Sequence, residues 1–521
     1  MKTKLTYGLL ASLPLVPAAA SAQDQKPNIL FIQADQLSVK ALSCYGGAVE
    51  TPNLDRLARE GALFEHAYAS RPTSSPCRAS IVTGLYTHQH GVVSNTSPKV
   101  QQGLGPGDVT TDKILWENGY ATHHYGKWHI GGEGSFPYFP DMYGYTNYMQ
   151  TRRGEAKKRR AEEGGEDWMY FKGMDFPVEL ADPIRKKQNQ FREKWGKKES
   201  FESFSRIGRL KLDTDQWVDY QVATRAIETM TSYKDSGRPF MVTASFIWPH
   251  DPNFAPSEYY DRIDPDKLQL PGTPVIEDIY KDDWSAQLAK GWGKDGVKEF
   301  LRIYYANVMM VDDQVGRLLD ALEKNGQLDN TLVVFVADHG DMMGNHSMVW
   351  KTTKSFYQDV AQVPLLIRYP KAVKAGKRYS MPVSVVDLMP TFLSAAGMEN
   401  LLPEDRPGIN LLPYLKGRKN EKNFPRTYVF SERIDNNSNG ERRVSLNPKA
   451  GFMATDTHWK YVIHPDGREL LFNMDKDPLE TEDVASLAEN RSRVLAFRAE
   501  LRKWLEETQW TGGYSFLDKL N

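Results

Sequence analysis

A serine at the start of a helix-like segment is the first residue of this chain whose setting favours chemistry. Ser74 precedes Pro76, which suits the first position of a helix, and the residues that follow can continue that helix. Backbone N–H groups at a helix N-terminus favour negative charge, and Arg78 lies one turn further on, where it can point back to Ser74. A serine at this position is also a common N-cap. The spacing alone therefore indicates either a helix cap or a site for an anion.

Two pairs of polar residues, each directly after an apolar strand-like run, have the composition of a metal site. The pairs are Asp35 with Gln36 and Asp338 with His339. Two carboxylates and an amide oxygen suit a hard divalent cation such as Ca²⁺, whereas the His339 nitrogen leaves Mn²⁺ or Zn²⁺ open. Either pair alone would more often be a turn or a helix cap. Both pairs together predict one divalent metal ion, which we expect to be Ca²⁺.

The segment 74–84 resembles the signature of the sulfatase family, Cys/Ser-x-Pro-x-Arg followed by Ala-Ser-Leu-Leu-Thr-Gly. Alignment on Arg78, Ala79 and Ser80 places Ser74, and not Cys77, at the position that the family oxidises to formylglycine (3-oxoalanine). The resemblance implies that one oxygen of the hydrated aldehyde attacks sulfur. The other oxygen later expels sulfate as the aldehyde re-forms, which splits a difficult displacement into two steps. Oxidised Ser74 would also join the metal ligands.

The same resemblance assigns roles to basic residues in three further segments. The run 126–129 is similar to the family's Gly-Lys-Trp-His, in which the lysine (Lys127) binds sulfate and the histidine (His129) supports the nucleophile. His250 matches the histidine of a His-x-Pro segment that donates a proton to the leaving alcohol. Lys351 aligns with a second sulfate-binding lysine, and Lys354 is its rival. Arg78, the two lysines and the metal would together stabilise charge that develops on the sulfate oxygens.

Gln36 departs from the pattern most common in the family, which has Asp at this position. This choice resembles the branch of choline sulfatases and phosphonate monoester hydrolases. A choline sulfatase, or a phosphonate monoester or phosphodiester hydrolase, is therefore the alternative to a sulfatase acting on a sulfated carbohydrate. A third hypothesis from another class is a non-catalytic glycan-binding protein on a sulfatase scaffold. The complete set of ligands and proton donors counts against it.

These residues need an α/β fold to bring them together. The apolar runs 28–32, 239–246 and 331–337 predict buried strands, and the patterns at 52–61 and 299–324 predict helices. Strands that alternate with helices imply an α/β sandwich with a mainly parallel sheet, whose ligands bind beyond the carboxyl ends of the strands. The resemblance implies the alkaline-phosphatase-like form of this fold.

We expect a catalytic domain over 23–412 and a smaller α+β subdomain over 413–521. Strand patterns at 427–431, 451–455, 459–464 and 469–472, with a hairpin turn at Asp466-Gly467, predict an antiparallel sheet. An amphipathic helix is predicted over 484–508 and should cover that sheet.

The stretch 134–212 differs from the rest of the catalytic domain. It carries basic clusters at 157–160 and 185–187 among many aromatic residues, including Trp168, Tyr170 and Trp195. One interpretation is a solvated, salt-bridge-laced helical insertion. The other is a substrate-recognition lobe whose aromatic rings stack on sugars and whose cations meet anionic groups.

The N-terminus has the pattern of a signal peptide. Lys2 and Lys4 precede an apolar run to Ala20, and the run ends in an A-x-A site that predicts cleavage after Ala22. We therefore expect a periplasmic or secreted protein. A formal net charge of -1 favours neither nucleic acid nor an anionic membrane as a partner, and no later apolar run is long enough to insert in a bilayer. Two cysteines are too few for a disulfide framework, so they are expected as thiols or as one bridge.

The function expected from these observations is removal of sulfate from a sulfated saccharide by an exported enzyme. A serine hydroxyl is a poor nucleophile, and no adjacent base motif activates Ser74. The serine-type members of the family resemble substrates of an oxygen-independent radical maturation enzyme. Such an enzyme is the protein partner that the sequence implies.

Overall fold

The computed structural model describes residues 26–96, 102–131, 213–251, 253–273, 278–436 and 446–518, together with the short segments 143–144, 168–171, 174–180 and 207–210. The predicted signal peptide at 1–22 lies outside the described residues, as do both basic clusters of the 134–212 stretch and Trp195.

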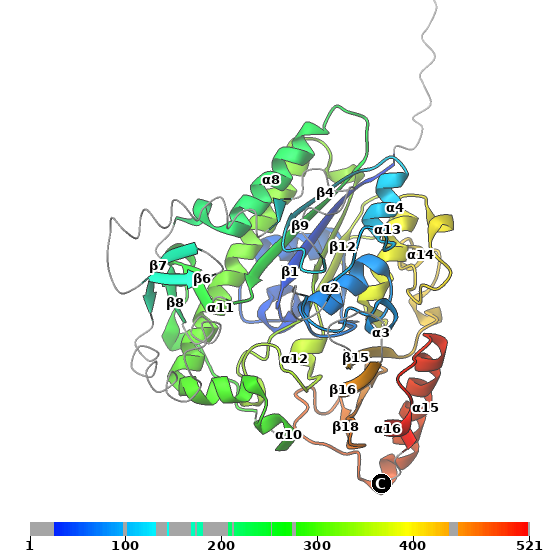
Figure 1. The fold of residues 1–521 in the computed structure, drawn as a ribbon. Helices are drawn as coiled ribbons and strands as arrows, with labels where there is room; N and C mark the ends of the chain where they lie inside the picture. The colour runs from blue at the N-terminus through cyan, green and yellow to red at the C-terminus, as the bar shows by residue number, and fades with distance from the viewer. Residues whose placement is uncertain are drawn as a thin grey trace, which may run out of the picture.

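A central sheet of eight strands forms the middle layer of the larger part (Figure 1). In spatial order the strands are β13 (Lys377–Tyr379), β2 (Ala62–Phe64), β12 (Leu365–Arg368), β11 (Thr331–Ala337), β1 (Asn28–Asp35), β9 (Phe240–Pro249), β4 (Ala121–Gly126) and β5 (Tyr143–Gly144). The five strands from β11 to β5 run parallel, and β12 is antiparallel to both of its neighbours. The prediction of a mainly parallel sheet is therefore confirmed.

Helices cover both faces of this sheet, because its central strands are apolar on both sides and must be buried from both. On one face α8 (Val218–Ser232) and α11 (Trp284–Lys324) pack on β9, and α1 (Pro52–Glu60) packs on α11. On the other face lie α2 (Ser74–Thr83), α4 (Thr111–Glu117) and α13 (Leu388–Ala395) (Figure 1). The short helices are α3 (Thr87–His90), α9 (Ser257–Tyr260), α10 (Asp278–Lys281), α12 (Gln358–Ala361), α14 (Leu412–Leu415) and α16 (Ser515–Asp518).

The C-terminal part is an antiparallel sheet covered by a helix, as predicted. Its strands are β15 (Val429–Asn436), β16 (Leu446–Thr455), β17 (Trp459–Ile463) and β18 (Glu469–Asn473). Helix α15 (Arg491–Glu507) buries Phe497 and Leu501 in a core that includes Phe452 and Leu471 of the sheet. The helix begins seven residues later than predicted, because Val484 instead donates its N–H to Leu471 of β18.

The two parts are joined next to the segment that leads into α2. The N–H of Glu432 in β15 donates to the carbonyl oxygen of Ser70 (2.9 Å). The Glu432 carboxylate accepts from the N–H of His88 (3.0 Å) and contacts its Nδ1 (2.9 Å). These bonds are buried, so β15 is fixed beside the residues just before Ser74. A two-stranded sheet of β3 (Ala67–Tyr68) and β14 (Val383–Ser384) lies in the same region.

The described segments of the 134–212 stretch are strands, so the helical interpretation is wrong for them. Strands β6 (Trp168–Phe171), β7 (Met174–Leu180) and β8 (Ile207–Leu210) form a sheet with β10 (Asn253–Pro256). Strand β10 follows His250 within three residues. The stretch is therefore attached to the catalytic part beside that histidine.

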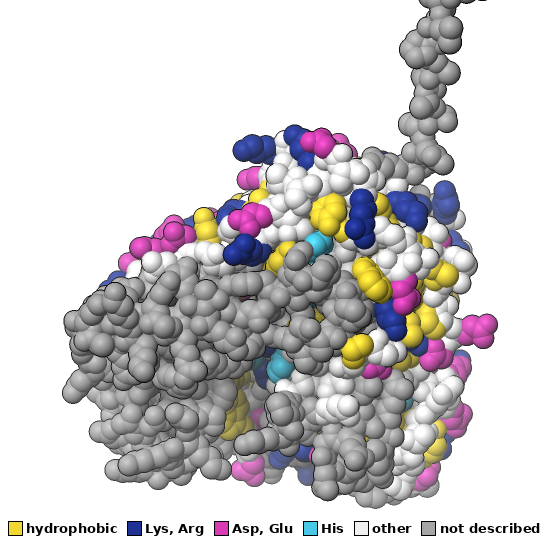
Figure 2. All heavy atoms as spheres, turned by 45° about the horizontal axis from the view of Figure 1, so that its top comes forward, with side chains coloured by type: hydrophobic (Ala, Val, Ile, Leu, Met, Phe, Trp, Pro, Cys, Tyr) yellow, Lys and Arg dark blue, Asp and Glu magenta, His cyan; other side chains and the backbone are white. Residues whose placement is uncertain are grey.

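The surface carries interspersed charges, in keeping with the net charge of -1. Figure 2 shows Lys and Arg side chains mixed with Asp and Glu side chains over the described part of one face. Both cysteines are free thiols, with Cys77 buried and Cys44 half-buried. Among the described residues, no helix combines the length and apolar character that crossing a bilayer requires.

Candidate active site

The two predicted polar pairs meet at one edge of the central sheet. Strands β1 and β11 are parallel neighbours in register from Asn28 with Thr331 to Ala34 with Ala337, so the residues after each strand lie side by side. One ligand atom each from Asp35, Asp338 and His339 lie within 4.8 Å of one another. All three side chains are fully buried.

Two unpaired oxygens show that this cluster fits a cation. Among the described residues, Asp35 Oδ1 and Gln36 Oε1 are buried without a hydrogen-bond donor. Gln36 Nε2 donates to Asp341 Oδ2 (2.7 Å), which fixes the amide and leaves its oxygen for another partner. The backbone of Gln36 has a φ of 61°, a left-handed conformation that is uncommon for a side chain of this kind. Buried oxygens without donors are costly unless a cation satisfies them.

His339 is held in the form that a metal ligand needs. Its Nδ1 donates to the carbonyl oxygen of Gly340 (2.9 Å), so Nε2 carries the lone pair. Burial, followed by the charge of Lys351, holds the pKa of His339 well below its usual value, which keeps the imidazole neutral. Two carboxylates, one amide oxygen and one imidazole nitrogen thus form a donor set for a divalent ion.

The two carboxylates respond differently to their surroundings. Burial alone would raise the pKa of Asp35, but the charges of Lys127, His250 and Arg78 hold it well below its usual value. Burial and the neighbouring Asp35 charge raise the pKa of Asp338. The pKa of Asp338 rises because two like charges share one buried site. A bound cation would offset the cost of their repulsion.

Ser74 lies at the amino end of α2, next to this cluster. Its Oγ is 3.2 Å from His339 Nε2 and 3.5 Å from Lys127 Nζ. The helix begins at Ser74 itself, with Thr73 as its N-cap, whereas the sequence predicted Ser74 just before the helix. Ser74 is fully buried, so its hydroxyl faces the side chains of the cluster and not bulk water.

Arg78 holds both carboxylates in place from one turn further along α2. Its Nε donates to Asp338 Oδ2 (2.8 Å) and its Nη2 to Asp35 Oδ2 (3.1 Å). Its Nη1 donates to Ser245 Oγ (2.7 Å), to the Lys127 carbonyl (3.0 Å) and to Gln33 Oε1 (3.2 Å). In this arrangement Arg78 orients the carboxylates, and its predicted contact with sulfate stays a prediction.

Lys127 and His129 follow the end of β4 and approach the same centre. Lys127 Nζ is 2.5 Å from Asp35 Oδ2, so its charge lies between this carboxylate and Ser74. His129 is connected through its backbone, because its carbonyl oxygen accepts from Ser75 Oγ (2.5 Å). The role predicted for the His129 imidazole stays a prediction.

A histidine–lysine pair forms another side of the site. Lys351 Nζ lies 2.8 Å from His250 Nε2, and His250 Nδ1 lies 2.7 Å from Asp251 Oδ1. A lysine ammonium can only donate, so His250 accepts at Nε2 and donates at Nδ1 in this arrangement. Burial lowers the pKa of both groups. His250 Nε2 is also 3.8 Å from Asp35 Oδ1, which places the pair at the cluster.

Lys351 and Lys354, the two candidates for the second sulfate-binding lysine, have different surroundings in the structure. Lys351 acts electrostatically on His250 and His339 of the centre. The charge of Lys354 acts on His464 at the end of β17, and its backbone N–H donates to Asp283 Oδ2 (3.1 Å). Of the two, Lys351 contacts the centre, and its predicted binding of sulfate stays a prediction.

Three supporting side chains were missed by the sequence reasoning. Asp341 orients Gln36, Ser245 accepts from Arg78, and Asp251 orients His250. Asp341 lies two residues from His339 and Asp251 lies one residue from His250, so proximity in sequence to predicted site residues could have indicated both. Burial raises the pKa of Asp341 to about 7, although N–H groups of Met343, Gln36 and Trp350 donate to it.

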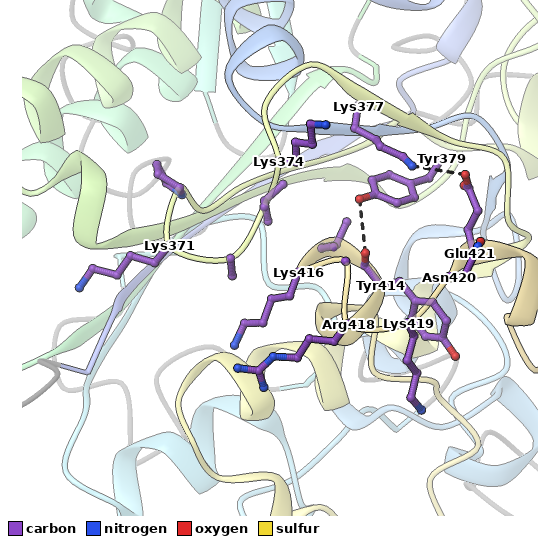
Figure 3. Close-up of a pocket in the computed structure, with 15 residues that line it drawn as sticks. Lys371, Lys374, Lys377, Tyr379, Tyr414, Lys416, Arg418, Lys419, Asn420 and Glu421 are labelled. Atoms are coloured by element: carbon purple, nitrogen blue, oxygen red, sulfur yellow. Dashed lines mark hydrogen bonds and ion pairs between the residues drawn. The ribbon is translucent and has the colours of Figure 1, made fainter.

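A more open hollow of about 690 Å³ lies away from this centre. Figure 3 shows six cationic side chains around it, namely Lys371, Lys374, Lys377, Lys416, Arg418 and Lys419. Arg368 at the end of β12 pairs with Val333 near the start of β11, so this hollow lies at the edge of the sheet opposite Asp338. It is therefore separate from the candidate active site.

Comparison with known proteins agrees with this geometry. A family model described as Sulfatase matches residues 27–398. The chain belongs to the sulfatase family. A second model, described as N-sulphoglucosamine sulphohydrolase, C-terminal, matches residues 344–509, which include the C-terminal sheet of this sulfatase.

Individual relatives cover nearly all of the chain. It is 28% identical to the N-acetylglucosamine-6-O-sulfatase of Bacteroides thetaiotaomicron, over 96% of this chain and 89% of the relative. A structure solved with its substrate D-glucosamine-2-N,6-O-disulfate has a TM-score of 0.67 and 24% identity, covering 93% of this chain and 98% of that one. The structure of the phosphonate monoester hydrolase of Agrobacterium radiobacter has a TM-score of 0.70 and 24% identity, and the match covers 92% of this chain and 96% of that one. The two structural likenesses show the fold, which is alkaline-phosphatase-like.

Membership of the family carries two chemical consequences. A sulfatase uses a divalent metal and a modified nucleophile, and the group of Asp35, Asp338 and His339 fits such a metal site. The prediction of an enzyme that hydrolyses sulfuric esters is thus confirmed.

Proposed function

We propose that this sulfatase removes sulfate from a sulfated carbohydrate after oxidation of Ser74 to formylglycine. The observation that carries the proposal is the position of Ser74, buried at the amino end of α2 and 3.2 Å from His339 of the acidic cluster. The substrate class is supported by the N-acetylglucosamine-6-O-sulfatase and the disulfated glucosamine complex among the relatives.

The metal in this proposal is one Ca²⁺, held by Asp35, Gln36, Asp338, His339 and oxidised Ser74. Three oxygen-donor side chains favour Ca²⁺, and His339 makes Mn²⁺ or Zn²⁺ the alternatives. When bound, the ion would neutralise negative charge on the sulfate and on the nucleophile. Arg78 keeps the two carboxylates in the orientation that binding requires, because it donates to both.

In this proposal each side chain of the site has a separate role in the reaction. Lys127 and Lys351 bind sulfate oxygens, and both lie within hydrogen-bonding distance of catalytic groups. An oxygen of the hydrated aldehyde attacks sulfur while the bond from sulfur to the sugar oxygen breaks. His250, when it carries a proton at Nε2, gives that proton to the sugar oxygen, and the proton that the attacking hydroxyl loses restores the balance. Asp251 holds the imidazole in position. Loss of sulfate then regenerates the aldehyde.

The second candidate function lies in the same superfamily. Gln36 and His339, together with the likeness to a phosphonate monoester hydrolase, favour a choline sulfatase or a phosphonate monoester or phosphodiester hydrolase. Paired kinetics with 4-nitrophenyl sulfate and a 4-nitrophenyl phosphodiester separate these functions. A larger kcat/KM for the phosphodiester would favour the second candidate.

Maturation and export complete the proposal. Ser74 is oxidised by an oxygen-independent radical maturation enzyme, and cleavage after Ala22 delivers the enzyme to the periplasm or the medium. The catalytic domain spans 23–412, and the subdomain 413–521 and the 134–212 lobe set the specificity. The attachment of that lobe beside His250 through β8 and β10 supports a role in holding the substrate.

Sulfate release from a panel of defined sulfated saccharides tests the proposed function. The protein used must have verified oxidation at Ser74, and a Ser74→Ala variant prepared in parallel is the control. Release from at least one saccharide, lost in the control, is the expected result. Matured protein that binds saccharides without releasing sulfate would instead indicate the glycan-binding alternative.

A further inference from the structure

Two buried arginines lie beside the segment that leads into Ser74. Arg71 precedes Ser74 by three residues, and Arg433 belongs to β15 of the C-terminal sheet. Their exposed fractions are 7% and 2%. They come from the two parts of the molecule and meet where β15 is bonded to Ser70.

The contacts of Arg433 connect it to both sides of the active site. Its Nη2 is 3.4 Å from the Pro72 carbonyl oxygen and 3.4 Å from Thr352 Oγ1. Pro72 is two residues from Ser74, and Thr352 directly follows Lys351. Its Nε donates to the Ser355 carbonyl oxygen (3.1 Å). The guanidinium therefore lies between the segment of the nucleophile and the segment of a sulfate-binding lysine.

The hydrogen-bond acceptors that the described part of the chain offers these two arginines are all neutral. Arg71 Nη1 donates to the Ile434 carbonyl oxygen (2.5 Å), and Arg71 Nε is buried without an acceptor among the described residues. Within the same part of the chain, neither guanidinium forms an ion pair with a carboxylate. Arg426, another arginine at the junction of the two parts, binds both oxygens of Asp387 at 2.5 and 2.7 Å.

Two guanidiniums that have no carboxylate acceptor among the described residues are unfavourable in one buried place. Burial lowers the pKa of Arg71 to about 10, although the charges of Glu432 and Asp435 act in the opposite direction. Burial, and next the charge of Arg71, lowers the pKa of Arg433 to about 9, although the charge of Asp283 acts in the opposite direction. Both groups stay charged at neutral pH, and they repel each other. Buried charges of this kind need a counter-charge, and removal of one partner of a buried pair is typically destabilising.

We propose that Arg71 and Arg433 form an anion subsite that binds a second anionic group of the substrate, a carboxylate or a sulfate near the scissile sulfate. The inference rests on the proposed function and narrows its substrate to saccharides with at least two negative charges. Arginine suits this task because its planar donors match the geometry of carboxylate and sulfate oxygens. The subsite would also give the C-terminal sheet a direct part in choosing the substrate.

Matched pairs of substrates test the subsite. Each sulfated saccharide that the enzyme cleaves is compared with the same saccharide lacking one anionic group, such as N-acetyl in place of N-sulfate or hydroxymethyl in place of a uronate carboxyl. The variants are Arg433→Met and Arg71→Met, which keep an apolar side chain, and Arg433→Lys, which keeps the charge. Arg426→Lys is the control at the junction.

We expect the wild-type enzyme to prefer the doubly anionic member of a pair by about tenfold or more in kcat/KM, as a charged hydrogen bond allows. Arg433→Met should raise KM for that member by about tenfold and change kcat and KM for the other by less than about threefold. Arg433→Lys should restore part of the preference. The Arg426→Lys control should lower Tm without changing the preference.

A wild-type enzyme that shows no preference within any pair would overturn the subsite. Equal losses on both members in Arg433→Met and Arg71→Met would do the same, because they would mean a structural role. Binding of the same pairs to unmatured protein, which retains Ser74, is measured by thermal shift and does not depend on turnover. If no saccharide is cleaved, the proposed function is wrong. The binding preference between the members of each pair still shows whether the anion subsite exists.

Discussion

At the scale of single residues, activity should depend on the side chains that bind the metal and on the side chain that donates a proton. The cluster of Asp35, Asp338 and His339 is buried, and Arg78 donates hydrogen bonds to both carboxylates of the cluster. Burying these carboxylates without a cation costs free energy, and their fixed orientation suits them to bind one. Metal content and catalysis should therefore fail together when a ligand is removed.

Asp338→Ala tests this dependence. We expect the variant to lose its divalent ion and to lose activity by at least about a thousandfold, because one of the two carboxylates, which is also one of the acceptors of Arg78, is gone. Elemental analysis of purified protein gives the metal content, and sulfate release gives the activity. Asp320→Ala, which removes an exposed carboxylate of α11, is the control and should change neither. An active Asp338→Ala enzyme without metal would refute the assigned ligand set.

His250→Gln tests the proton donor. The pair with Lys351 and the bond to Asp251 place His250 Nε2 toward the metal cluster. Sugar alcohols are poor leaving groups and need a proton, whereas 4-nitrophenol does not. We expect kcat for a sugar sulfate to fall by about 10²–10⁴-fold and that for 4-nitrophenyl sulfate by far less. Equal losses for the two substrates would exclude His250 as the general acid.

At the scale of elements, the strands that carry the site were predictable and several other elements were not. The runs 28–32 and 331–337 are apolar throughout, and this is typical of strands buried on both faces. Helix α11 was predicted from 299 onward, but it begins at Trp284. Gly291 and Gly293 interrupt the pattern there, and Gly293 is a non-helical break within the helix (φ 68°). Strands β6 to β8 were missed because their mixed charged and aromatic composition gives no clear periodicity.

Long-range contacts explain why the site itself could be predicted only in part. Strand ends and a helix start indicate which residues approach one another, and the register of β1 with β11 fulfils that expectation. The bonds of Arg78 to Asp35 and Asp338 join residues 43 and 260 positions apart. The contacts of Arg433 with Pro72 and Thr352 depend on how two separate sheets meet. Local sequence patterns hold no information on such distances.

The C-terminal sheet should depend on the buried face of α15 for its stability. Leu501 is fully buried against that sheet, whereas Leu495 on the same helix is 44% exposed. We expect Leu501→Ala to destabilise the protein by about 2–5 kcal/mol, since a buried leucine leaves a cavity. Leu495→Ala should cost less than about 0.5 kcal/mol, as surface substitutions do. Urea or thermal unfolding measures both variants, and similar losses in the two would contradict the described packing.

At the scale of the whole molecule, two of the places where the described residues gather positive charge lie far apart in the fold. One is the active site with Lys127 and Lys351, and the other is the hollow of about 690 Å³ at the opposite edge of the sheet (Figure 3). Lys374→Glu together with Lys416→Glu reverses charge at the second place. Because screening limits the range of exposed charges to about 8 Å at physiological salt, kcat/KM for small sulfate esters should stay within about twofold. A tenfold loss would show that chemistry depends on this hollow.

In the proposed mechanism an oxidised Ser74 is the nucleophile, and the mass of one peptide shows whether this oxidation has occurred. The protein is made with and without a radical maturation enzyme, and the tryptic peptide that contains Ser74 is measured alongside sulfate release. We predict that active protein shows a loss of two hydrogens at Ser74, and that activity rises in proportion to the oxidised fraction. Full turnover by protein whose Ser74 is an intact serine would exclude formylglycine as the nucleophile.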